Sequence, residues 1–456
     1  MYQYLTELMD YAIEKKLIEE DDRTYCINRI LNLIGATAYE KTEYQKHDNI
    51  EEILEGLLNF AYKNKKIPDN TIGYRDLLSA DIMDVLTPKP SIVKNNFYSL
   101  YEESPKSATQ YFYDLSRNDN YIMTERVKKD IRWKTNTKYG EIDITINLSK
   151  PEKDPKAIAA AKTQKQTGYP KCLLCAENEG YEGSLTHPPR ANHRIIPIDL
   201  NGHKWYMQYS PYVYYNEHCI VLNSEHTPMK ITEQTFKNLL SFVERFPHYF
   251  IGSNADLPIV GGSILTHDHF QGGNYEFAMA RCPYRFEVKI NGYDDITVGV
   301  VDWALSTIRL KGNSVDRIVE LAGKILAKWR EYSDESNEIL AYTDAPHNTI
   351  TPIARQKDGN FELDLILRNN RTTGEHPLGI FHPHAEYHHI KKENIGLIEA
   401  MGLAVLPSRL KTELGELTPE KKEEVGQIFA CILENCGVFK DTPKGNDGIK
   451  KFLETI

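Results

Sequence analysis

The chain has 456 residues, of which 41% are hydrophobic and 26% charged, and its formal net charge is −10. This length is enough for two or three domains with a sizeable core. Binding to a nucleic-acid backbone needs a basic face, and no long Lys/Arg stripe appears, so the composition argues against nucleic acid as a partner. No apolar run approaches the length of a membrane span. The seven cysteines are sparse and odd in number, and the first residues lack a signal-peptide pattern, which together predict a cytoplasmic protein.

Residues 1–130 are predicted to form a helical N-terminal region. Apolar residues from Tyr4 to Leu17 recur at helical spacing, with charged residues between them. A second helix is predicted over residues 26–34, closed by Gly35. Nothing in this region has a catalytic pattern, so we interpret it as a helical cap or an oligomer surface.

After residue 130 the pattern changes, and predicted strands alternate with predicted helices. In the first series, strands cover residues 141–148, 204–209 and 218–222, and a helix covers residues 233–246 after the N-cap Thr232. In a second series, strands lie near residues 286–290, 297–303 and 361–367, and a helix covers residues 314–331. Further helices are predicted over residues 393–405 and 419–436. Because the second series loosely repeats the first, we expect a duplicated core with halves at residues 131–284 and 285–456.

The segment 261–273, GGSILTHDHFQGG, places His267, His269 and Gln271 at alternate positions between two glycine pairs. In an extended strand these three side chains share one face. Two imidazoles and a carboxamide suit a phosphate, because one ring attacks phosphorus and the amide donates to a phosphoryl oxygen. The glycines let backbone N–H groups approach an anion closely. Alternation alone leaves both histidines as candidate nucleophiles, and the simpler alternative is a polar strand edge with chance histidines.

Cys172 and Cys175 have the spacing of a metal knuckle. A structural zinc site needs four ligands, and no second cysteine pair has this spacing, so the other ligands would be histidines. His226 follows a predicted strand and precedes a helix, and His267 lies one strand step before His269, so both fit a zinc site. Three histidines compete as ligands: His187, His193 and His218. The alternatives are two ordinary reduced cysteines, or a redox pair, for which the surrounding βαβ pattern is missing.

A second His-x-His pair, His382 and His384, lies in the segment 381–389. This segment lacks a glycine-rich approach and has Glu386 where a glutamine would be needed. It is interpreted either as a surface histidine cluster or as a substrate or second-metal site.

The run from Ser253 to Val260, continuing through Gly261-Gly262-Ser263 into the His267–Gln271 segment, resembles the histidine-triad superfamily. Within it, the match is to the galactose-1-phosphate uridylyltransferases. The aspartate between the two histidines, the cysteine knuckle and the long helical N-terminal region are similar to the second, mainly bacterial type of that family. The resemblance covers most of the chain and is most specific between residues 170 and 280.

This resemblance implies an α+β fold, with the helical region joined to a duplicated histidine-triad-like core of antiparallel sheets flanked by helices. It implies that His269 is the nucleophile that accepts a uridylyl group and that Gln271 hydrogen-bonds the phosphoryl oxygens. The residues that match the zinc ligands of better-known relatives are Cys172, Cys175, His226 and His267. The residues in the segment that binds the nucleotide phosphates are Asn254, Gly261, Gly262 and Ser263. Ser263 precedes the first histidine by four residues, against three in the better-known type, which leaves its role open.

The implied reaction converts UDP-glucose and galactose 1-phosphate into UDP-galactose and glucose 1-phosphate by double displacement through a uridylyl-histidine, in galactose metabolism. A neutral imidazole is the right nucleophile near pH 7, and its other nitrogen is expected to donate to a backbone carbonyl, for example in the 261–263 turn. Hydrolases of the superfamily usually carry a third histidine where Gln271 stands. Because glutamine cannot act as a general acid, it favours transfer over hydrolysis.

Better-known members also carry an iron site on a strand of the second half. The strand aligned with it, residues 363–366, has no histidine, so no iron site is expected unless His382 and His384 replace it. Relatives complete their sites across subunits, which implies a homodimer. Four residues are candidate sugar contacts or, more simply, a solvated helix face: Lys391, Lys392, Glu399 and Arg409.

Two other functions stay open at this point. The first is a nucleotide phosphorylase or adenylyltransferase of the same superfamily, acting on ATP or a dinucleoside polyphosphate. The second is a zinc-stabilised nucleotide-binding module without turnover.

Overall fold

The computed structural model describes residues 1–149, 168–262 and 264–456. They form two compact units. Of the described residues, the smaller unit comprises 1–129, 149, 168–198 and 206–213, and the larger comprises 130–148, 199–205, 214–262 and 264–456. Among the described residues, no helix is both long and apolar enough to cross a membrane.

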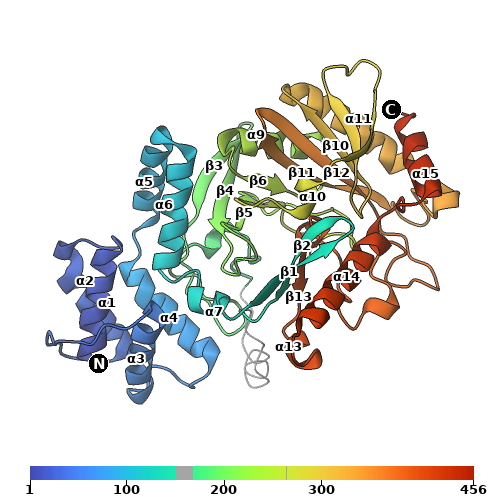
Figure 1. Cartoon of the computed structure of the whole chain (residues 1–456). Helices are drawn as coiled ribbons and strands as arrows, with labels where there is room; N and C mark the ends of the chain where they lie inside the picture. Colours follow the sequence, from blue (N-terminus) through green and yellow to red (C-terminus); the bar gives the residue numbers. More distant parts are fainter. Residues whose placement is uncertain (150–167, 263) are drawn as a thin grey trace. The chain divides into compact units, whose positions relative to one another are not determined.

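The smaller unit is mainly helical, as the apolar periodicity of its N-terminal part predicts (Figure 1). Its helices are α1 (Tyr2–Glu14), η1 (Glu20–Asp22), α2 (Arg23–Ile34), α3 (Ile50–Lys63), α4 (Ile72–Leu86), α5 (Pro90–Glu103), α6 (Pro105–Asn118), α7 (Thr124–Val127) and η2 (Ala176–Asn178). As predicted, α2 ends at Gly35, whose φ of 75° is the left-handed conformation that favours glycine at a helix C-terminus. Helices α5 and α6 lie side by side.

A ten-stranded sheet, to which β3 and β4 contribute residues of both units, organises the larger unit. Its strands are β3 (Ile196–Leu200), β4 (His203–Tyr209), β5 (Cys219–Asn223), β6 (Phe250–Gly252), β7 (His269–Gly273), β8 (Tyr284–Val288), β9 (Thr297–Val301), β10 (Thr307–Gly312), β11 (Asn348–Lys357) and β12 (Asn360–Asn369). Their order across the sheet is β3-β4-β5-β7-β6-β11-β12-β10-β9-β8.

This strand order repeats itself. Counted from one edge, the first half runs β3-β4-β5-β7-β6, and counted from the other edge, the second half runs β8-β9-β10-β12-β11. In chain order, each half also has a long helix between its third and fourth strands: α9 (Glu233–Arg245) between β5 and β6, and α11 (Val315–Glu331) between β10 and β11. Both helices pack against β11 and against each other. The two halves meet where β6 pairs with β11, so the core is duplicated as predicted, while the exact limits at residues 130/131 and 284/285 stay predictions.

A smaller sheet joins distant parts of the larger unit. It contains β1 (Ile131–Thr137), β2 (Gly140–Ile146) and β13 (Leu403–Leu406), with β2 and β13 parallel. The first turns of α14 (Pro419–Cys436) lie against β1, where the indole of Trp133 donates to the Lys422 carbonyl. The other helices of this unit are α10 (Ala278–Arg281), η3 (Glu335–Asn337), η4 (Ala385–Tyr387), α12 (Leu397–Ala400), α13 (Leu410–Glu413) and α15 (Pro443–Leu453).

The helix predicted over residues 393–405 is wrong. This segment forms the short α12 and then β13, with Gly402 at φ 108° between them. The left-handed backbone of Gly402 ends the helix, and the next four residues then gain a full strand partner in β2. Local apolar periodicity was therefore overridden by pairing with a strand that lies far away in the sequence.

Candidate active site

His269 and Gln271 lie on β7, an inner strand between β5 and β6. The alternation predicted for this strand is present, because Phe270, between them, is buried and stacks on Trp205 with ring centroids 4.6 Å apart. His267 lies just before the strand, in a bend, so the three polar residues do not all belong to one extended segment. β7 begins only at His269 because the backbone N–H of Asp268 is taken by the Thr227 carbonyl, in the loop after β5.

The imidazole of His269 is buried, and one of its nitrogens has a fixed partner. Nδ1 lies 2.7 Å from the backbone carbonyl of His267. A carbonyl only accepts, so Nδ1 carries the proton and donates, which leaves a lone pair on Nε2. Burial lowers the pKa of His269 to about 4, so the ring is neutral at pH 7. A backbone carbonyl was expected in this role, but it belongs to His267 and not to the 261–263 turn.

Gln271 is half-buried and is held by a histidine that the sequence marked only as a competing metal ligand. Nε2 of His218 lies 3.1 Å from Oε1 of Gln271. The contact follows from strand pairing, because β5 and β7 are antiparallel with Ile220 opposite Gln271 and Cys219 opposite Gly272. His218 precedes β5 directly, which brings its ring beside the carboxamide.

The glycine-rich segment before β7 is packed closely. Asn254 is buried, and its Oδ1 accepts a hydrogen bond of 2.9 Å from the backbone N–H of Leu397, at the start of α12. A Cβ on Gly262 would lie 2.6 Å from Nδ2 of Asn254, and a Cβ on Gly261 would lie 2.5 Å from the Ala255 carbonyl. Both glycines are therefore required by close contact with neighbouring residues. Ser263, the fourth residue predicted here, lies outside the described residues.

The cysteine knuckle is a tight turn held by backbone interactions. The Sγ atoms of Cys172 and Cys175 are 3.6 Å apart, and the Leu174 N–H points at Sγ of Cys172 at 3.4 Å. The Asn178 amide donates to the carbonyls of both cysteines, at 2.9 and 2.8 Å. Burial raises the pKa of the Cys175 thiol to about 11. Two thiols converge on one point, as a metal knuckle requires.

All four residues predicted as metal ligands form one group. The ligand atoms of Cys172, Cys175, His226 and His267 lie within 4.8 Å of one another. Nε2 of His267 is 2.8 Å from the Asn223 carbonyl, to which it donates, so Nδ1 is its ligand atom. Two thiols and two imidazoles are a donor set that suits zinc, and this Cys/His cluster has the geometry to hold a metal ion.

The competing histidines have other partners. Nε2 of His187 is 2.6 Å from Oδ1 of Asn178, and Nε2 of His193 is 3.1 Å from Oε1 of Gln208. His218 contacts Gln271, as described above.

The second His-x-His segment also has hydrogen-bond partners of its own. His382 lies between the Pro383 carbonyl and the Asn394 side chain, both at 3.2 Å. His384 is 3.2 Å from the Ile380 carbonyl and 3.1 Å from the Asn435 amide. Within residues 1–149, 168–262 and 264–456, neither histidine belongs to a group with metal-ligand geometry.

The strand aligned with the relatives' iron site carries an ion-pair network. Asp364 on β12 is fully buried and pairs with Arg309 at 2.6 Å and with Arg355 at 2.8 Å. Glu362, two residues earlier on the same face, also pairs with Arg355. Burial alone raises the pKa of the Asp364 carboxyl, but the two guanidinium charges outweigh it and lower the pKa to about 2.

One of the residues interpreted as a solvated face is instead buried. Lys391 is 6% exposed, and its Nζ donates to Oε1 of Glu399 at 3.0 Å and to the Val405 carbonyl at 3.2 Å. The other carboxylate oxygen of Glu399 accepts the Gly396 N–H at the start of α12. The Lys391–Glu399 pair therefore supports the turn at the start of α12. In this turn, the N–H of Leu397 donates to Asn254. Lys392 is exposed, and Arg409 pairs with Glu413 in an exposed contact.

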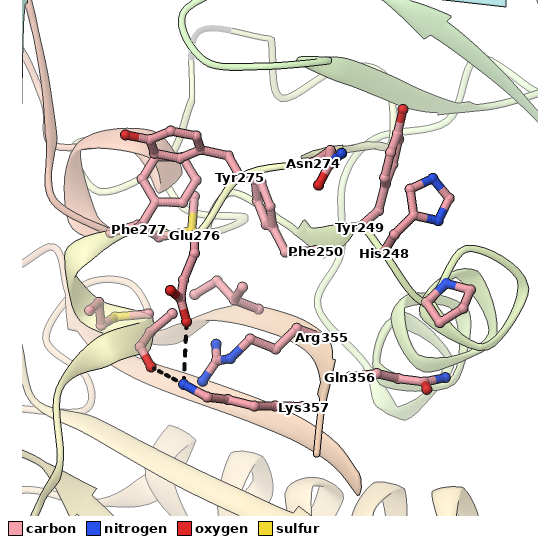
Figure 2. A pocket seen from close by; sticks show the side chains of 15 residues that line it. His248, Tyr249, Phe250, Asn274, Tyr275, Glu276, Phe277, Arg355, Gln356 and Lys357 are labelled. Atoms are coloured by element: carbon pink, nitrogen blue, oxygen red, sulfur yellow. Dashed lines mark hydrogen bonds and ion pairs between the residues drawn. The ribbon is translucent and has the colours of Figure 1, made fainter. Parts of the chain in front are cut away.

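A cavity of about 330 Å³ lies elsewhere in the larger unit (Figure 2). It is lined by residues 274–280 after β7, by the end of β11 and by residues 247–250, and its lining includes neither His269 nor Gln271. Lys357 reaches across it to the Glu276 carboxylate at 3.3 Å and to the Ala280 carbonyl at 3.4 Å. Arg355 also faces it, with its charge already balanced by Glu362 and Asp364. This cavity is therefore separate from His269, whose Nε2 carries the available lone pair.

Comparisons with family models and with known relatives point to the same family over most of the chain. Residues 16–228 match the family model described as "Galactose-1-phosphate uridyl transferase, N-terminal domain", and residues 242–430 match the C-terminal domain of the same family. The chain is 49% identical to a galactose-1-phosphate uridylyltransferase of Clostridium perfringens, over 99% of this chain and 98% of that one. It is 48% identical to one of Bacillus subtilis, over 100% and 97% of the two chains.

Among solved structures, the chain matches the crystal structure of a yeast Ap4A phosphorylase with a TM-score of 0.40 and 14% identity. The match covers 76% of this chain and 94% of that one.

Proposed function

We propose, on the premise that the chain belongs to the galactose-1-phosphate uridylyltransferase family, that His269 carries the uridylyl group in its reaction. The protein is a nucleotidyltransferase of galactose metabolism. Its substrates under this proposal are UDP-glucose and galactose 1-phosphate, and its products are UDP-galactose and glucose 1-phosphate. The observation that carries the role of His269 is its buried ring, which donates through Nδ1 to His267 and keeps the Nε2 lone pair for attack.

The proposed reaction has two displacements at the same phosphorus. Nε2 of His269 attacks the α-phosphorus of UDP-glucose, a P–N bond forms, and the P–O bond to glucose 1-phosphate breaks with its electron pair on the departing phosphate oxygen. A phosphate oxygen of galactose 1-phosphate then attacks the same phosphorus and displaces the imidazole. The Nδ1 proton stays on the ring throughout, and the His267 carbonyl supports the positive charge of the uridylylated imidazole.

The side-chain amides of Gln271 and Asn254 are proposed to bind the phosphoryl oxygens. In each, the amide oxygen already has a partner from the protein, Nε2 of His218 for Gln271 and the Leu397 N–H for Asn254. The NH2 groups are then the free ends, and they donate to an anion. Gly261, Gly262 and Ser263 are proposed to complete the phosphate segment.

Isotope exchange tests the nucleophile. Labelled glucose 1-phosphate should exchange into UDP-glucose without galactose 1-phosphate, because the first displacement is complete and reversible on its own. His269→Ala should abolish exchange and the trapped uridylyl-protein, while His203→Ala, an exposed histidine on β4, serves as the control and should retain both. Full exchange in His269→Ala would overturn the assignment. Exchange with ATP in place of UDP-glucose would identify a different nucleotidyltransferase, and no exchange from either donor would indicate a binding module.

A structural zinc ion is proposed at the Cys172, Cys175, His226 and His267 cluster. When bound, the zinc ion would link the cysteine knuckle to His267, in the loop directly before His269. Protein purified without chelators should contain about one zinc per chain, and Cys172→Ser should lose it, since a closed structural site needs four ligands. Cys431→Ser is the matched control, because Cys431 lies outside the cluster. Zinc-free protein with a normal melting temperature would refute a structural role.

A cytoplasmic homodimer is proposed from the family resemblance and the small number of cysteines. Seven cysteines in 456 residues suit a reducing compartment, where disulfides are rare. Light scattering on the purified protein tests the oligomeric state, and a monomer at working concentration would refute the dimer.

A further inference from the structure

We infer that His218 is a positioning residue for this reaction: it fixes which end of the Gln271 carboxamide faces the substrate. The inference rests on the proposed function, because it concerns the amide that binds the phosphoryl oxygens. His218 is 3% exposed and stands directly before β5, the strand paired with β7. The only hydrogen bond of its side chain among the described residues joins Nε2 to Oε1 of Gln271, at 3.1 Å.

The ring of His218 has a fixed position. Tyr215 lies against it with ring centroids 4.5 Å apart, and Tyr214 is stacked with it at 5.5 Å. Tyr215 is itself buried, and its hydroxyl donates to the Gly272 carbonyl, next to Gln271. The two aromatic rings therefore hold the imidazole in register with β7, so its nitrogen meets the carboxamide at a defined place.

Only one proton is available on this ring. Burial lowers the pKa of His218 to about 4, so the neutral form is present at pH 7. Nδ1 has no hydrogen-bond partner among the described residues. A buried N–H without an acceptor is costlier than a lone pair without a donor, so the proton belongs on Nε2. Nε2–H then donates to Oε1 of Gln271.

This direction matters because a carboxamide has two unlike ends. Phosphoryl oxygens at neutral pH only accept hydrogen bonds, so the NH2 end of Gln271 must face them. If the amide flipped so that its two ends changed places, its oxygen would face the anion and repel it. His218 disfavours that flip, since its Nε2–H would then face the NH2 group. The Leu397 N–H acts on Asn254 in the same way, so both amides of the site have their oxygen occupied by a protein donor.

His193 offers a matched control in the smaller unit. It is 1% exposed, its Nε2 lies 3.1 Å from Oε1 of Gln208, its Nδ1 has no partner among the described residues, and it stacks on Tyr121 at 4.5 Å. This is the same local arrangement as that of His218, at a glutamine outside the proposed site. A loss of stability that is common to buried histidine–glutamine pairs will therefore appear in variants at both His193 and His218. A loss of substrate positioning will appear only in variants at His218.

The test compares exchange between glucose 1-phosphate and UDP-glucose in variants at both positions. His218→Phe and the smaller His218→Leu keep apolar bulk but remove the donor, and their exchange kcat should fall about tenfold to a hundredfold with a smaller change in KM, because amide orientation acts on the transition state. His218→Gln, whose amide reaches the Nε2 position, should restore kcat to within about threefold. His193→Phe should leave the exchange rate per folded molecule unchanged.

A cycle with Gln271→Ala separates positioning from general packing. If His218 acts through Gln271, His218→Leu should have no further effect on kcat in the Gln271→Ala background. An equal fold-loss in both backgrounds, or wild-type exchange in His218→Leu, would overturn the inference while leaving the proposed function intact. If His218→Phe does not fold, the Leu and Gln variants decide the same question. Absence of exchange in the wild-type protein would instead overturn the proposed function itself.

Discussion

Asp364 is expected to be the most sensitive single carboxylate of the larger unit. It is fully buried on β12 and forms ion pairs with Arg309 and Arg355 at 2.6 and 2.8 Å. Asp364→Asn keeps the shape and one acceptor oxygen but removes the charge, and leaves two guanidinium groups to share Glu362. Removing one member of a buried ion pair costs about 3–5 kcal/mol, because the remaining charge loses its compensation without regaining water.

Urea unfolding followed by tryptophan fluorescence measures this loss. The four tryptophans all belong to the larger unit, so the signal reports on the part that contains Asp364. With an m-value of about 3 kcal/mol per M, the midpoint should fall by about 1 M or more. Asp295→Asn is the control, because Asp295 pairs with Arg317 at the surface at 3.3 Å and should cost less than about 1 kcal/mol.

The dependence of folding stability on pH provides a second test. Because the pKa of Asp364 is lowered to about 2, its contribution to stability is fully present above about pH 4 and is lost as the pH falls toward 2. The wild-type protein and Asp364→Asn should therefore converge in stability below pH 4. The double variant Arg309→Met/Asp364→Leu should recover part of the loss by removing both charges. A loss below about 1 kcal/mol in Asp364→Asn, or no recovery in the double variant, would refute this reasoning.

Two further predictions follow from single residues. Asp119, at the end of α6, is fully buried, and burial raises its pKa to about 8. The folded protein therefore keeps a proton on Asp119 that the unfolded chain releases near pH 4. For this reason the folding stability falls as the pH rises from about 4 to about 8. Asp119→Asn keeps the acceptor for the Tyr121 N–H and should flatten this pH dependence, which stabilises the protein at pH 8 by about 1–3 kcal/mol. Urea unfolding followed by far-ultraviolet circular dichroism measures the effect. Parallel curves of stability against pH for the two proteins would contradict this prediction. Gly262→Ala places a Cβ 2.6 Å from the Asn254 amide, which must shift, so KM for UDP-glucose should rise about tenfold or more. Gly374→Ala, where a Cβ meets nothing within 4 Å, should leave KM unchanged. Equal KM values in the two variants would count against a role for Asn254.

The sequence by itself determined the elements with strong local signals. Helical periodicity predicted helices in the N-terminal region, and period-two alternation predicted β2. The strands predicted over residues 218–222 and 361–367 match β5 and β12 to within a few residues. Period-two alternation also separated Phe270, which stacks on Trp205, from its polar neighbours His269 and Gln271. These features depend on spacing along the chain, which is visible in the sequence.

The four predicted metal ligands were also accessible from sequence, through the knuckle spacing and the family resemblance. The knuckle motif supplied Cys172 and Cys175, and the position of His226 between a strand and a helix marked a plausible partner. Their convergence within 4.8 Å is a property of the fold.

Other features were decided only by the tertiary structure. The central strand β11 contains Pro352, which has no N–H to donate, so local rules disfavour a strand there. It forms because β12 pairs with it along its whole length and β6 pairs with residues 353–355 on its other edge. Leu403–Leu406 became a strand rather than the end of a helix because β2 offered it a parallel partner.

The roles within the active site belong to this second class. Sequence spacing left both histidines as candidate nucleophiles, and the family resemblance, not the spacing, pointed to His269. The hydrogen bond from Nδ1 of His269 to the His267 carbonyl is what leaves its Nε2 lone pair available. Sequence also marked His218 only as a possible metal ligand, whereas pairing of β5 with β7 puts it against Gln271. Which nitrogen holds a proton, and which amide end faces a substrate, depends on partners that the fold brings together from distant parts of the chain, so spacing along the chain does not encode it.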